Sequence, residues 1–309
     1  MTATTRLEEF FRGGGGVAIT GASGWIGGAM AHVALQAMSG VGAERLRLFG
    51  SRARAVEIAG DVREVEALVG AGPLAPGPWL VLHLAVTGPD REPDPDALRA
   101  LNEGMLADAL ALAGTGEVRR LVSASSGAVY LPAQPDLHKQ AYNDLKRDQE
   151  QIARAWAAKT GAPLLLPRIF NVGGPYMTKA DRYALGSFVR QAETTGAIEI
   201  GARRPVLRSY VHALELAQVS FHLALGEEAD LAFDTAGAET VELADLAAAV
   251  GRALALPDLK IARPPMGAEA EDRYVGDGHA YRQALDEMGA EPVPLDAIIR
   301  DTAAYLRRL

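Results

Sequence analysis

The stretch that decides the fold is Val17-Ala18-Ile19-Thr20-Gly21-Ala22-Ser23-Gly24-Trp25-Ile26-Gly27. Its first four residues predict a buried strand, and the apolar residues after Gly27 recur at helical spacing. Three glycines in such a strand-to-helix turn let backbone N–H groups approach a pyrophosphate closely, and the helix N-terminus adds partial positive charge. We therefore expect a dinucleotide phosphate site formed by Gly21, Ser23, Gly24, Trp25, Ile26 and Gly27. A purely structural turn is the alternative in a chain with 33 glycines.

Outward from this turn, short apolar runs alternate with Ala-rich helical stretches. The expected strands are Val17–Thr20, Leu46–Phe49, Trp79–Ala85, Arg120–Ala124 and Leu164–Ile169, and the expected helices are Gly27–Met38, Pro95–Ala113, Gln140–Thr160, Val211–Leu225 and Leu243–Leu254. This order predicts an α/β protein with a Rossmann-type, doubly wound parallel sheet. We expect a dinucleotide-binding domain at 1–170, with a return at about 209–236, and a smaller substrate-binding domain over most of 171–309. Gly13–Gly16 is expected to be a flexible lead-in without a function of its own.

The composition is that of a globular protein. Of 309 residues, 49% are hydrophobic and 23% are charged, which excludes disorder of the whole chain. A net charge of -8 argues against binding nucleic acid or anionic membranes. No stretch reaches about 18 apolar residues, and no secretory signal is recognisable, so we expect a cytoplasmic protein. The chain has no cysteine, and its six histidines lack metal-ligand spacing, so we expect no metal.

The end of the second expected strand distinguishes NAD from NADP. An acidic residue there binds the adenosine ribose, whereas an arginine suits a 2′-phosphate. Leu46–Phe49 is followed by Gly50-Ser51-Arg52, with Arg54 close behind and no acid. This favours NADP, with NAD possible, although solvated loop charges would give the same pattern. Asp61 is placed either to reach the adenine edge or to form a structural turn.

A tyrosine and a lysine are four residues apart in Tyr142-Asn143-Asp144-Leu145-Lys146, on one face of an expected helix. A free phenol titrates near 10, so acid–base chemistry at neutral pH needs its anion stabilised, which a neighbouring ammonium group provides. A third group should hydrogen-bond the substrate oxygen, and the serines of 123–126 supply candidates. Ser123 and Ser125 equally suit strand-end capping.

Together these motifs resemble the extended short-chain dehydrogenase/reductase family, in particular its nucleotide-sugar epimerase/dehydratase branch. The resemblance covers nearly the whole chain and includes the motifs His83-Leu84-Ala85, Asn102, Pro167–Pro175, Arg208–His212 and Asp272-Arg273-Tyr274. It implies a catalytic triad of Ser126, Tyr142 and Lys146, because the family's hydroxyl lies four residues before the tyrosine of a Val-Tyr pair, here Tyr130. It also implies substrate contacts by Asn171, Arg208 and Arg273, the two arginines acting as clamps on a nucleotide diphosphate or, alternatively, forming interdomain salt bridges. Beyond the glycine turn, the expected cofactor contacts are Ser51, Arg52, Asp61, Val62, Leu84, Ala85, Tyr142 and Lys146.

Three reactions are compatible with this triad. Dehydratases of this branch carry an Asp-Glu pair directly after the catalytic hydroxyl, but Gly127 and Ala128 stand there, which disfavours dehydration. Epimerisation and reduction of a 4-keto sugar remain. The expected NADP binding favours a reductase that releases its cofactor, because epimerases of this family usually retain NAD. A non-catalytic dinucleotide sensor is the alternative of a different class, but it would not need Tyr142. The stretches Pro95–Ala113 and Gln140–Thr160 resemble the helices that pair across the family's dimer axis, so we expect a homodimer.

Overall fold

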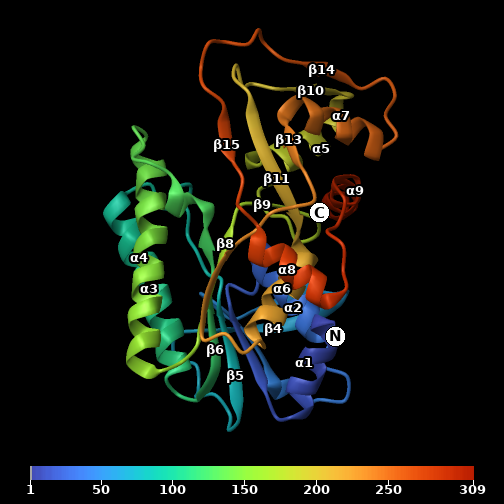
Figure 1. Cartoon of the computed structure of the whole chain (residues 1–309). Helices are drawn as coiled ribbons and strands as arrows, with labels where there is room; N and C mark the ends of the chain where they lie inside the picture. Colours follow the sequence, from blue (N-terminus) through green and yellow to red (C-terminus); the bar gives the residue numbers. More distant parts are fainter. Residues whose placement is uncertain (1) are drawn as a thin grey trace.

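The computed structural model describes residues 2–309 (Figure 1). Its helices are α1 (Ala3–Arg12), α2 (Trp25–Gln36), α3 (Pro95–Ala113), α4 (Leu137–Thr160), α5 (Ala184–Thr195), α6 (Ala213–Ala224), α7 (Leu243–Ala253), α8 (His279–Met288) and α9 (Leu295–Leu306), with short 3-10 turns η1 (Ala43–Arg45), η2 (Gly127–Tyr130) and η3 (Ala180–Arg182). Its strands are β1 (Gly16–Thr20), β2 (Leu46–Gly50), β3 (Arg54–Ile58), β4 (Asp61–Ala67), β5 (Pro78–His83), β6 (Glu117–Ser123), β7 (Ser125–Ser126), β8 (Leu164–Ile169), β9 (Asn171–Gly173), β10 (Ala197–Glu199), β11 (Val206–His212), β12 (Asp230–Asp234), β13 (Thr240–Glu242), β14 (Lys260–Ala262) and β15 (Asp272–Tyr274).

One large sheet organises the lower part of the molecule in Figure 1. Its strand order is β12-β8-β6-β5-β1-β2-β4-β3, with β7 also paired to β8, and every pair is parallel except β3 with β4. The order runs in opposite directions on the two sides of β1, so a crevice for ligands opens at the carboxyl ends of β1 and β5. The predicted Rossmann-type doubly wound sheet is confirmed.

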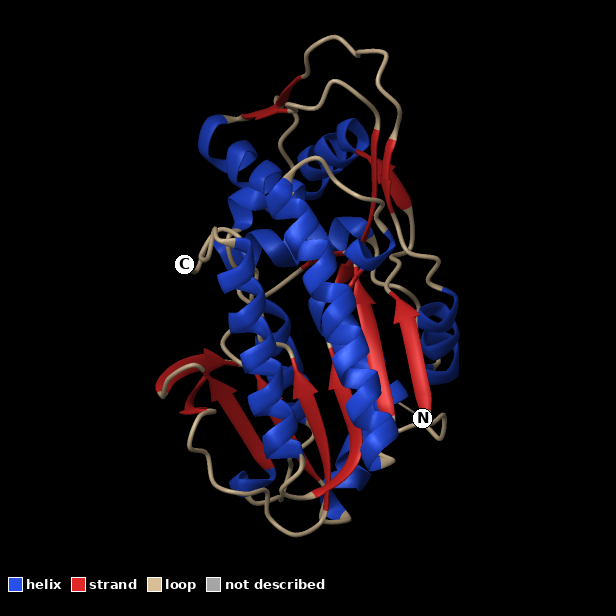
Figure 2. Ribbon diagram, turned by 90° about the vertical axis from the view of Figure 1, so that its left-hand side faces the viewer, coloured by secondary structure: helices blue, strands red, loops and turns tan. Residues whose placement is uncertain are grey.

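Helices cover both faces of this sheet. On one face, α3 and α4 lie side by side, and Leu106 and Ala153 from these helices pack with Val81 and Leu121 of the strands (Figure 2). On the other face, α1, α2, α6 and α8 share a second core with the opposite sides of the strands, in which Met30 and Phe221 are fully buried. The result is a three-layer arrangement that leaves the carboxyl edge of the sheet free for a site.

A second, smaller lobe sits above that edge. It contains the strands β13-β11-β15, with β9 paired to β11, and a core formed with α5, α7 and α9. After β11 the chain returns from this lobe to the large sheet, because α6 packs on α2 and β12 pairs with β8. Residues 213–234 therefore belong structurally to the first sheet. Among residues 2–309, no helix has both the length and the apolar character needed to cross a bilayer.

Several element boundaries differ from the predictions for local reasons. The helix expected at Gln140 begins at Leu137, because the Asp136 carboxylate accepts from the backbone N–H groups of His138 and Lys139. The helix expected at Val211 begins at Ala213, because Val211 pairs with β9 and His212 caps the helix. The strand expected to end at Ala85 ends at His83, where its partner β1 ends at Thr20.

Two parts of the prediction were wrong. Gly13–Gly16 is not a flexible lead-in: Gly13 caps α1, a helix that the prediction lacked, and a β-carbon at Gly16 would lie 2.6 Å from the Trp79 ring. No strand was predicted between β2 and β5, but β3 and β4 pair antiparallel there and form a hairpin at the sheet edge. This hairpin changes where Asp61 lies.

Candidate active site

The glycine turn between β1 and α2 has the geometry of a phosphate cradle. Gly21 has φ +72°, a conformation that L side chains rarely adopt, and a β-carbon there would lie 2.7 Å from the Ala85 nitrogen. A β-carbon at Gly27 would overlap the Gly21 carbonyl oxygen. Gly24 is the N-cap of α2, and no side chain caps the helix there. The first N–H groups of α2 thus remain available to an anion, which fits a dinucleotide pyrophosphate.

The expected contacts at the end of β5 lie beside this cradle. Leu84 donates its backbone N–H to the Thr20 carbonyl at 3.2 Å, and Ala85 borders Gly21. The neighbouring His83 is buried, with Nδ1 2.9 Å from the Thr20 hydroxyl. Burial and the nearby charge of Lys146 lower the pKa of His83 to about 3, so its imidazole is neutral at physiological pH.

On the β2 side of the cradle, Arg54 reaches the glycine turn. Its guanidinium group donates to the Ser23 hydroxyl. Ser51 and Arg52 are exposed in the same loop, and within the described chain the Arg52 side chain has no hydrogen bond or ion pair. Arg54 thus contacts the phosphate turn directly, whereas the sequence suggested it only as a neighbour of Arg52.

The structure does not bring Asp61 and Val62 to this loop. In the β3–β4 hairpin, Arg54 pairs with Val65, whereas Asp61 pairs with Ile58, four residues or about 13 Å further along the ladder. The Asp61 carboxylate accepts from Arg63 at 2.8 Å and is mostly exposed. The chain beside Gly50 at the carboxyl edge is instead Ala67 and Leu68, and Leu68 donates its N–H to the Gly50 carbonyl at 3.0 Å.

Ser126, Tyr142 and Lys146 lie together at the carboxyl edge of the large sheet. Tyr142 and Lys146 are one turn apart on α4, and the Ser126 hydroxyl at the end of β7 is close enough to lower the pKa of Tyr142. Lys146 is buried, and its Nζ donates to the Ala124 carbonyl at 3.1 Å and to Gln149 Oε1 at 3.0 Å. Gln149 thus holds the lysine, which the sequence did not suggest.

Burial dominates the titration of both α4 groups. It raises the pKa of Tyr142 above its ordinary value, against a lowering by the nearby Ser126 hydroxyl. It lowers the pKa of Lys146 to about 8, against a raising by the Glu150 carboxylate. Tyr142 is therefore a neutral phenol near neutral pH and is ready to donate a proton. The ammonium group expected to favour the phenolate directs its hydrogen bonds to Ala124 and Gln149 instead.

A buried ion pair fixes α4 to the sheet one turn after Lys146. The Glu150 carboxylate accepts two hydrogen bonds at 2.8 Å from Arg168 of β8 and one at 2.7 Å from the Ser125 hydroxyl. Bidentate pairing of this kind fixes geometry as well as charge. The same network keeps the pKa of Glu150 below its ordinary value, despite burial. Glu150 at helical spacing from Lys146 was the sequence signal for this contact.

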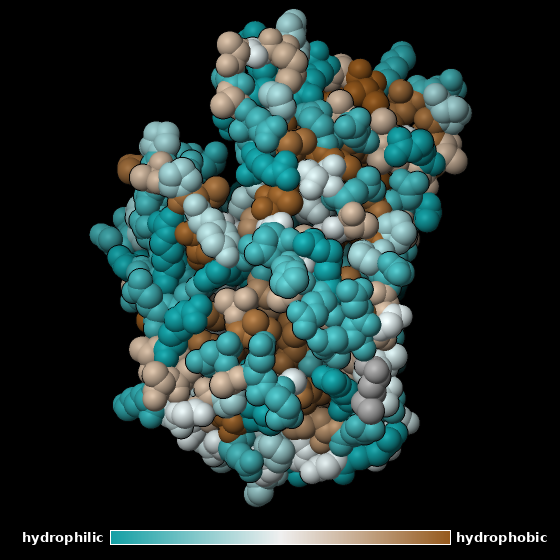
Figure 3. Space-filling view, viewed as in Figure 1, coloured by the Kyte–Doolittle hydropathy of each residue, from teal (hydrophilic) through white to brown (hydrophobic). Residues whose placement is uncertain are grey.

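Aromatic side chains form the wall opposite α4. Tyr274 of β15 places its hydroxyl 3.1 Å from Ser126 Oγ, and its ring packs against Phe170, with 4.7 Å between centroids. Phe170 in turn stacks on Tyr130 and fills the space beside Gly127. Figure 3 shows the surface notched between the start of α4 and the upper lobe. Tyr274 was not among the predicted site residues.

The three expected substrate residues lie in different settings. Asn171 donates its amide to the carbonyls of Ser209 and Tyr274, at 3.2 and 3.3 Å, and so joins β9, β11 and β15. Arg208 donates to Asp272 at 3.1 Å, and its guanidinium lies 5.8 Å from the centre of the Tyr274 ring. Arg273 is exposed, and because neighbours on a strand face opposite sides, it points away from the side that holds Tyr274. The geometry thus groups Arg208, but not Arg273, with Ser126.

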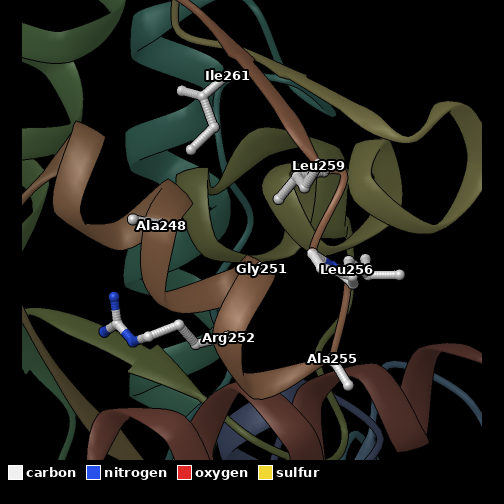
Figure 4. Close-up of a pocket in the computed structure, with 8 residues that line it drawn as sticks. Ala248, Gly251, Arg252, Ala255, Leu256, Leu259 and Ile261 are labelled. Carbon is white, nitrogen blue, oxygen red and sulfur yellow. The ribbon is translucent and has the colours of Figure 1, made fainter.

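A further hollow lies apart from these residues, on the upper lobe. It has a volume of about 600 Å³ and is lined by α7 and the segment that leads into β14, with Leu256, Leu259 and Ile261 among its apolar side chains (Figure 4). Its lining includes the charged residue Arg252. None of the predicted site residues lines it.

Comparison with known proteins identifies the family and related folds. The family model described as the NAD dependent epimerase/dehydratase family matches residues 17–232. Among curated proteins, no sequence matches this chain. The fold is similar to that of a UDP-N-acetylglucosamine 4-epimerase from Methanobrevibacter ruminantium M1 in complex with UDP-N-acetylmuramic acid, at 16% identity and a TM-score of 0.72 over 95% of this chain and 98% of that one.

Two further solved structures have similar folds. RMD from Pseudomonas aeruginosa, complexed with NADPH, is 19% identical with a TM-score of 0.68, over 95% of this chain and 99% of that one. MoeE5 in complex with UDP-glucose and NAD is 20% identical with a TM-score of 0.68, over the same shares. At these identities the likeness establishes the fold, and the family model covers more than two thirds of the chain. The chain belongs to the NAD dependent epimerase/dehydratase family, within the extended short-chain dehydrogenases/reductases.

Proposed function

We propose that this protein is an NAD(P)-dependent nucleotide-sugar oxidoreductase, either a 4-ketoreductase or an epimerase. The observation that carries the proposal is the grouping of Ser126, Tyr142 and Lys146 beside the glycine turn, at the carboxyl edge of a Rossmann sheet. Three similar structures hold a nucleotide sugar or a nicotinamide dinucleotide by their descriptions, which supports the same class of ligands here.

The residues of this chain divide the chemistry between them. When bound, the nicotinamide would supply or accept the hydride. The backbone of Gly21, Gly24 and Gly27 would hold its pyrophosphate. Tyr142 donates a proton to the substrate oxygen as its carbon gains a hydride, and removes the proton in the reverse direction. Ser126 hydrogen-bonds the same oxygen, and Lys146 in its ammonium form would hold the ribose.

NADP is the proposed dinucleotide, with NAD as the alternative. Arg54, held at Ser23, and Arg52 provide positive charge where a 2′-phosphate would lie, and no acid follows β2. The nucleotide released when the purified protein is denatured distinguishes the two reactions. Retained NAD favours an epimerase, whereas an empty site favours a reductase that exchanges NADP.

Dehydration is disfavoured by the same site. The two positions after Ser126 are Gly127 and Ala128, which carry no acid, and the Phe170 ring fills the space beside Gly127. Elimination of water from the sugar therefore lacks the acid and base groups that it needs. A dinucleotide sensor without catalysis remains the second candidate function, which the intact triad argues against.

The test is hydride transfer with a panel of UDP-glucose, UDP-N-acetylglucosamine and their 4-keto derivatives, followed by the absorbance of the reduced nicotinamide. Tyr142→Phe removes one oxygen and keeps the ring, so dinucleotide binding should survive while turnover falls by about 10² to 10⁴. If a panel member turns over and Tyr142→Phe matches the wild type, the triad is wrong. If no member turns over while the dinucleotide binds tightly, the result favours a sensor over an enzyme of this class.

A further inference from the structure

The hydroxyl groups of Tyr274 and Ser126 are 3.1 Å apart, although 148 positions separate them in the chain. The Tyr274 ring is held on β15 between Phe170, at 4.7 Å, and the Arg208 guanidinium, at 5.8 Å. Strand pairing of Tyr274 with Arg208 fixes its backbone. The phenol is thus held in one place, directly against the proposed catalytic serine.

Counting donors and acceptors gives this hydrogen bond a direction. A serine hydroxyl has one hydrogen to donate and two lone pairs that accept. The Ala128 backbone N–H donates to Ser126 Oγ at 3.2 Å, which uses one lone pair. If the Tyr274 hydroxyl donates to the second lone pair of Ser126 Oγ, the Ser126 hydrogen remains free to donate to a substrate oxygen beside Tyr142.

The surroundings of Tyr274 favour this direction. The hydrogen-bond partner of its hydroxyl is Ser126 Oγ, and the nearby Ala128 N–H already donates to Ser126. In residues 2–309, Ser126 Oγ is therefore the acceptor that the structure offers to the Tyr274 hydrogen. Of the charged side chains that act on Tyr274, Arg208 only donates, and Asp234 accepts from the Tyr130 hydroxyl. The carboxylate partner of Arg208, Asp272, is occupied by Arg208 and Arg204. Burial raises the pKa of Tyr274, so its hydrogen is retained at physiological pH.

We propose that Tyr274 is a positioning residue that donates to Ser126 and thereby directs the Ser126 hydrogen toward the reacting oxygen of the substrate. This inference rests on the proposed function and deepens it. Ser126 and Tyr142 then both present donors to one oxygen, an arrangement that suits a carbonyl oxygen gaining negative charge. Hydrogen bonds in such a chain polarise one another, so the donation by Tyr274 strengthens that of Ser126. The favoured substrate is accordingly the keto form of a nucleotide-linked sugar.

The kinetic test uses the member of the sugar panel that turns over. Tyr274→Phe should lower kcat by about tenfold, the worth of one hydrogen bond, and leave KM within about twofold. In a Ser126→Ala background the same substitution should change nothing further, because its effect passes through Ser126. A full effect of Tyr274→Phe in that background overturns the proposal. Tyr130→Phe is the matched control: it removes a phenol hydroxyl from the same aromatic wall, but that hydroxyl contacts Arg168 and Asp234.

A second measurement needs no substrate. The chain has no cysteine, so Ser126→Cys introduces a single thiol, whose pKa follows from the pH dependence of its alkylation by iodoacetamide. A donor at Tyr274 stabilises the thiolate. Adding Tyr274→Phe should therefore raise that pKa and slow alkylation at neutral pH by about threefold or more. Tyr142 and Lys146 are the other titratable groups that face the thiol, and both variants keep them.

The two measurements separate the possible failures. An unchanged thiol pKa overturns the donation by Tyr274, whatever the enzyme does. A panel in which no sugar turns over overturns the proposed function, while the alkylation result still decides whether Tyr274 donates to residue 126. Equal unfolding midpoints of wild type and Tyr274→Phe show that a fall in kcat does not come from lost stability.

Discussion

A β-carbon at Gly127 would overlap the ring of Phe170, so the ring occupies the space that any side chain at residue 127 would need. Gly127→Ala should therefore destabilise the protein by about 1–3 kcal/mol, the usual cost of overpacking a filled site. Gly201→Ala is the control, since nothing lies within 4 Å of a β-carbon there. Urea unfolding measures both variants. If Gly127→Ala is as stable as the control, the Phe170 ring can move aside. Its position then does not explain why residue 127 carries no acidic side chain.

Arg54 should contribute more to NADP affinity than Arg52 does. Its guanidinium is already held at Ser23 of the phosphate turn, whereas Arg52 extends into solvent. We expect Arg54→Ala to weaken NADP binding by about tenfold or more, as for a hydrogen bond to a charged group, and to change NAD binding little. Calorimetric titration with both dinucleotides measures this, with Arg63→Ala of the hairpin as control. Tighter binding of NAD than of NADP by the wild type would contradict the proposed preference.

Lys146 should make stability depend on pH in a defined direction. Its pKa is lowered to about 8 in the folded protein from 10.5, so the unfolded chain binds more protons between these values. Its contribution to the free energy of unfolding is therefore greatest above about pH 10.5 and is lost as the pH falls through 8. Lys146→Met should raise the Tm at pH 7, and the gain should shrink between pH 8 and 10. Thermal unfolding of both proteins across this range is the measurement; a constant difference would show that Lys146 titrates normally.

We expect a homodimer in which α3 and α4 of each chain pair across the dimer axis, with the outer face of α3 in the contact. This face is exposed and made mostly of small residues, which allow helices to approach closely, and its members are Ala97, Ala100, Leu101, Gly104, Ala107, Asp108 and Ala111. We expect light scattering to report twice the 32.6 kDa of the chain. Leu101→Arg should return the mass to that of one chain. Ile261→Arg is the control, because Ile261 is similarly exposed but lies on the upper lobe.

The fold was predictable because its signals are local. The glycine turn, the apolar strands and the helical spacing of α3 are each encoded within about 20 residues. Cap residues such as Asp136 and His212 moved the ends of helices by one to three residues. The hairpin of β3 and β4 was not predicted. The alternation of apolar and polar residues is the same in two short strands that pair with each other and in a strand that follows a helix. Asp61 was therefore expected at the wrong end of the edge strand.

The site was predictable only where its residues share an element or a motif. Tyr142 and Lys146 are one helical turn apart, so their spacing was sufficient to group them. Tyr274 reaches Ser126 only because β15 pairs with β11, and no local pattern carries that pairing. The same strand explains Arg273. Neighbouring residues on β15 face opposite sides, so Arg273 points away from the site that Tyr274 faces.

The hairpin edge also has a consequence for the order of folding. β2, β3 and β4 lie within residues 46–67, so the contacts of this edge close short loops. At the opposite edge, Leu164 of β8 must find Asp230 of β12 across a long intervening chain. Loop-closure entropy increases with the length of the closed chain, and contacts of low order form first. The edge that carries Arg54 should therefore gain amide-exchange protection early in refolding, and the β8–β12 edge, which lies beside the proposed catalytic residues, should gain it last.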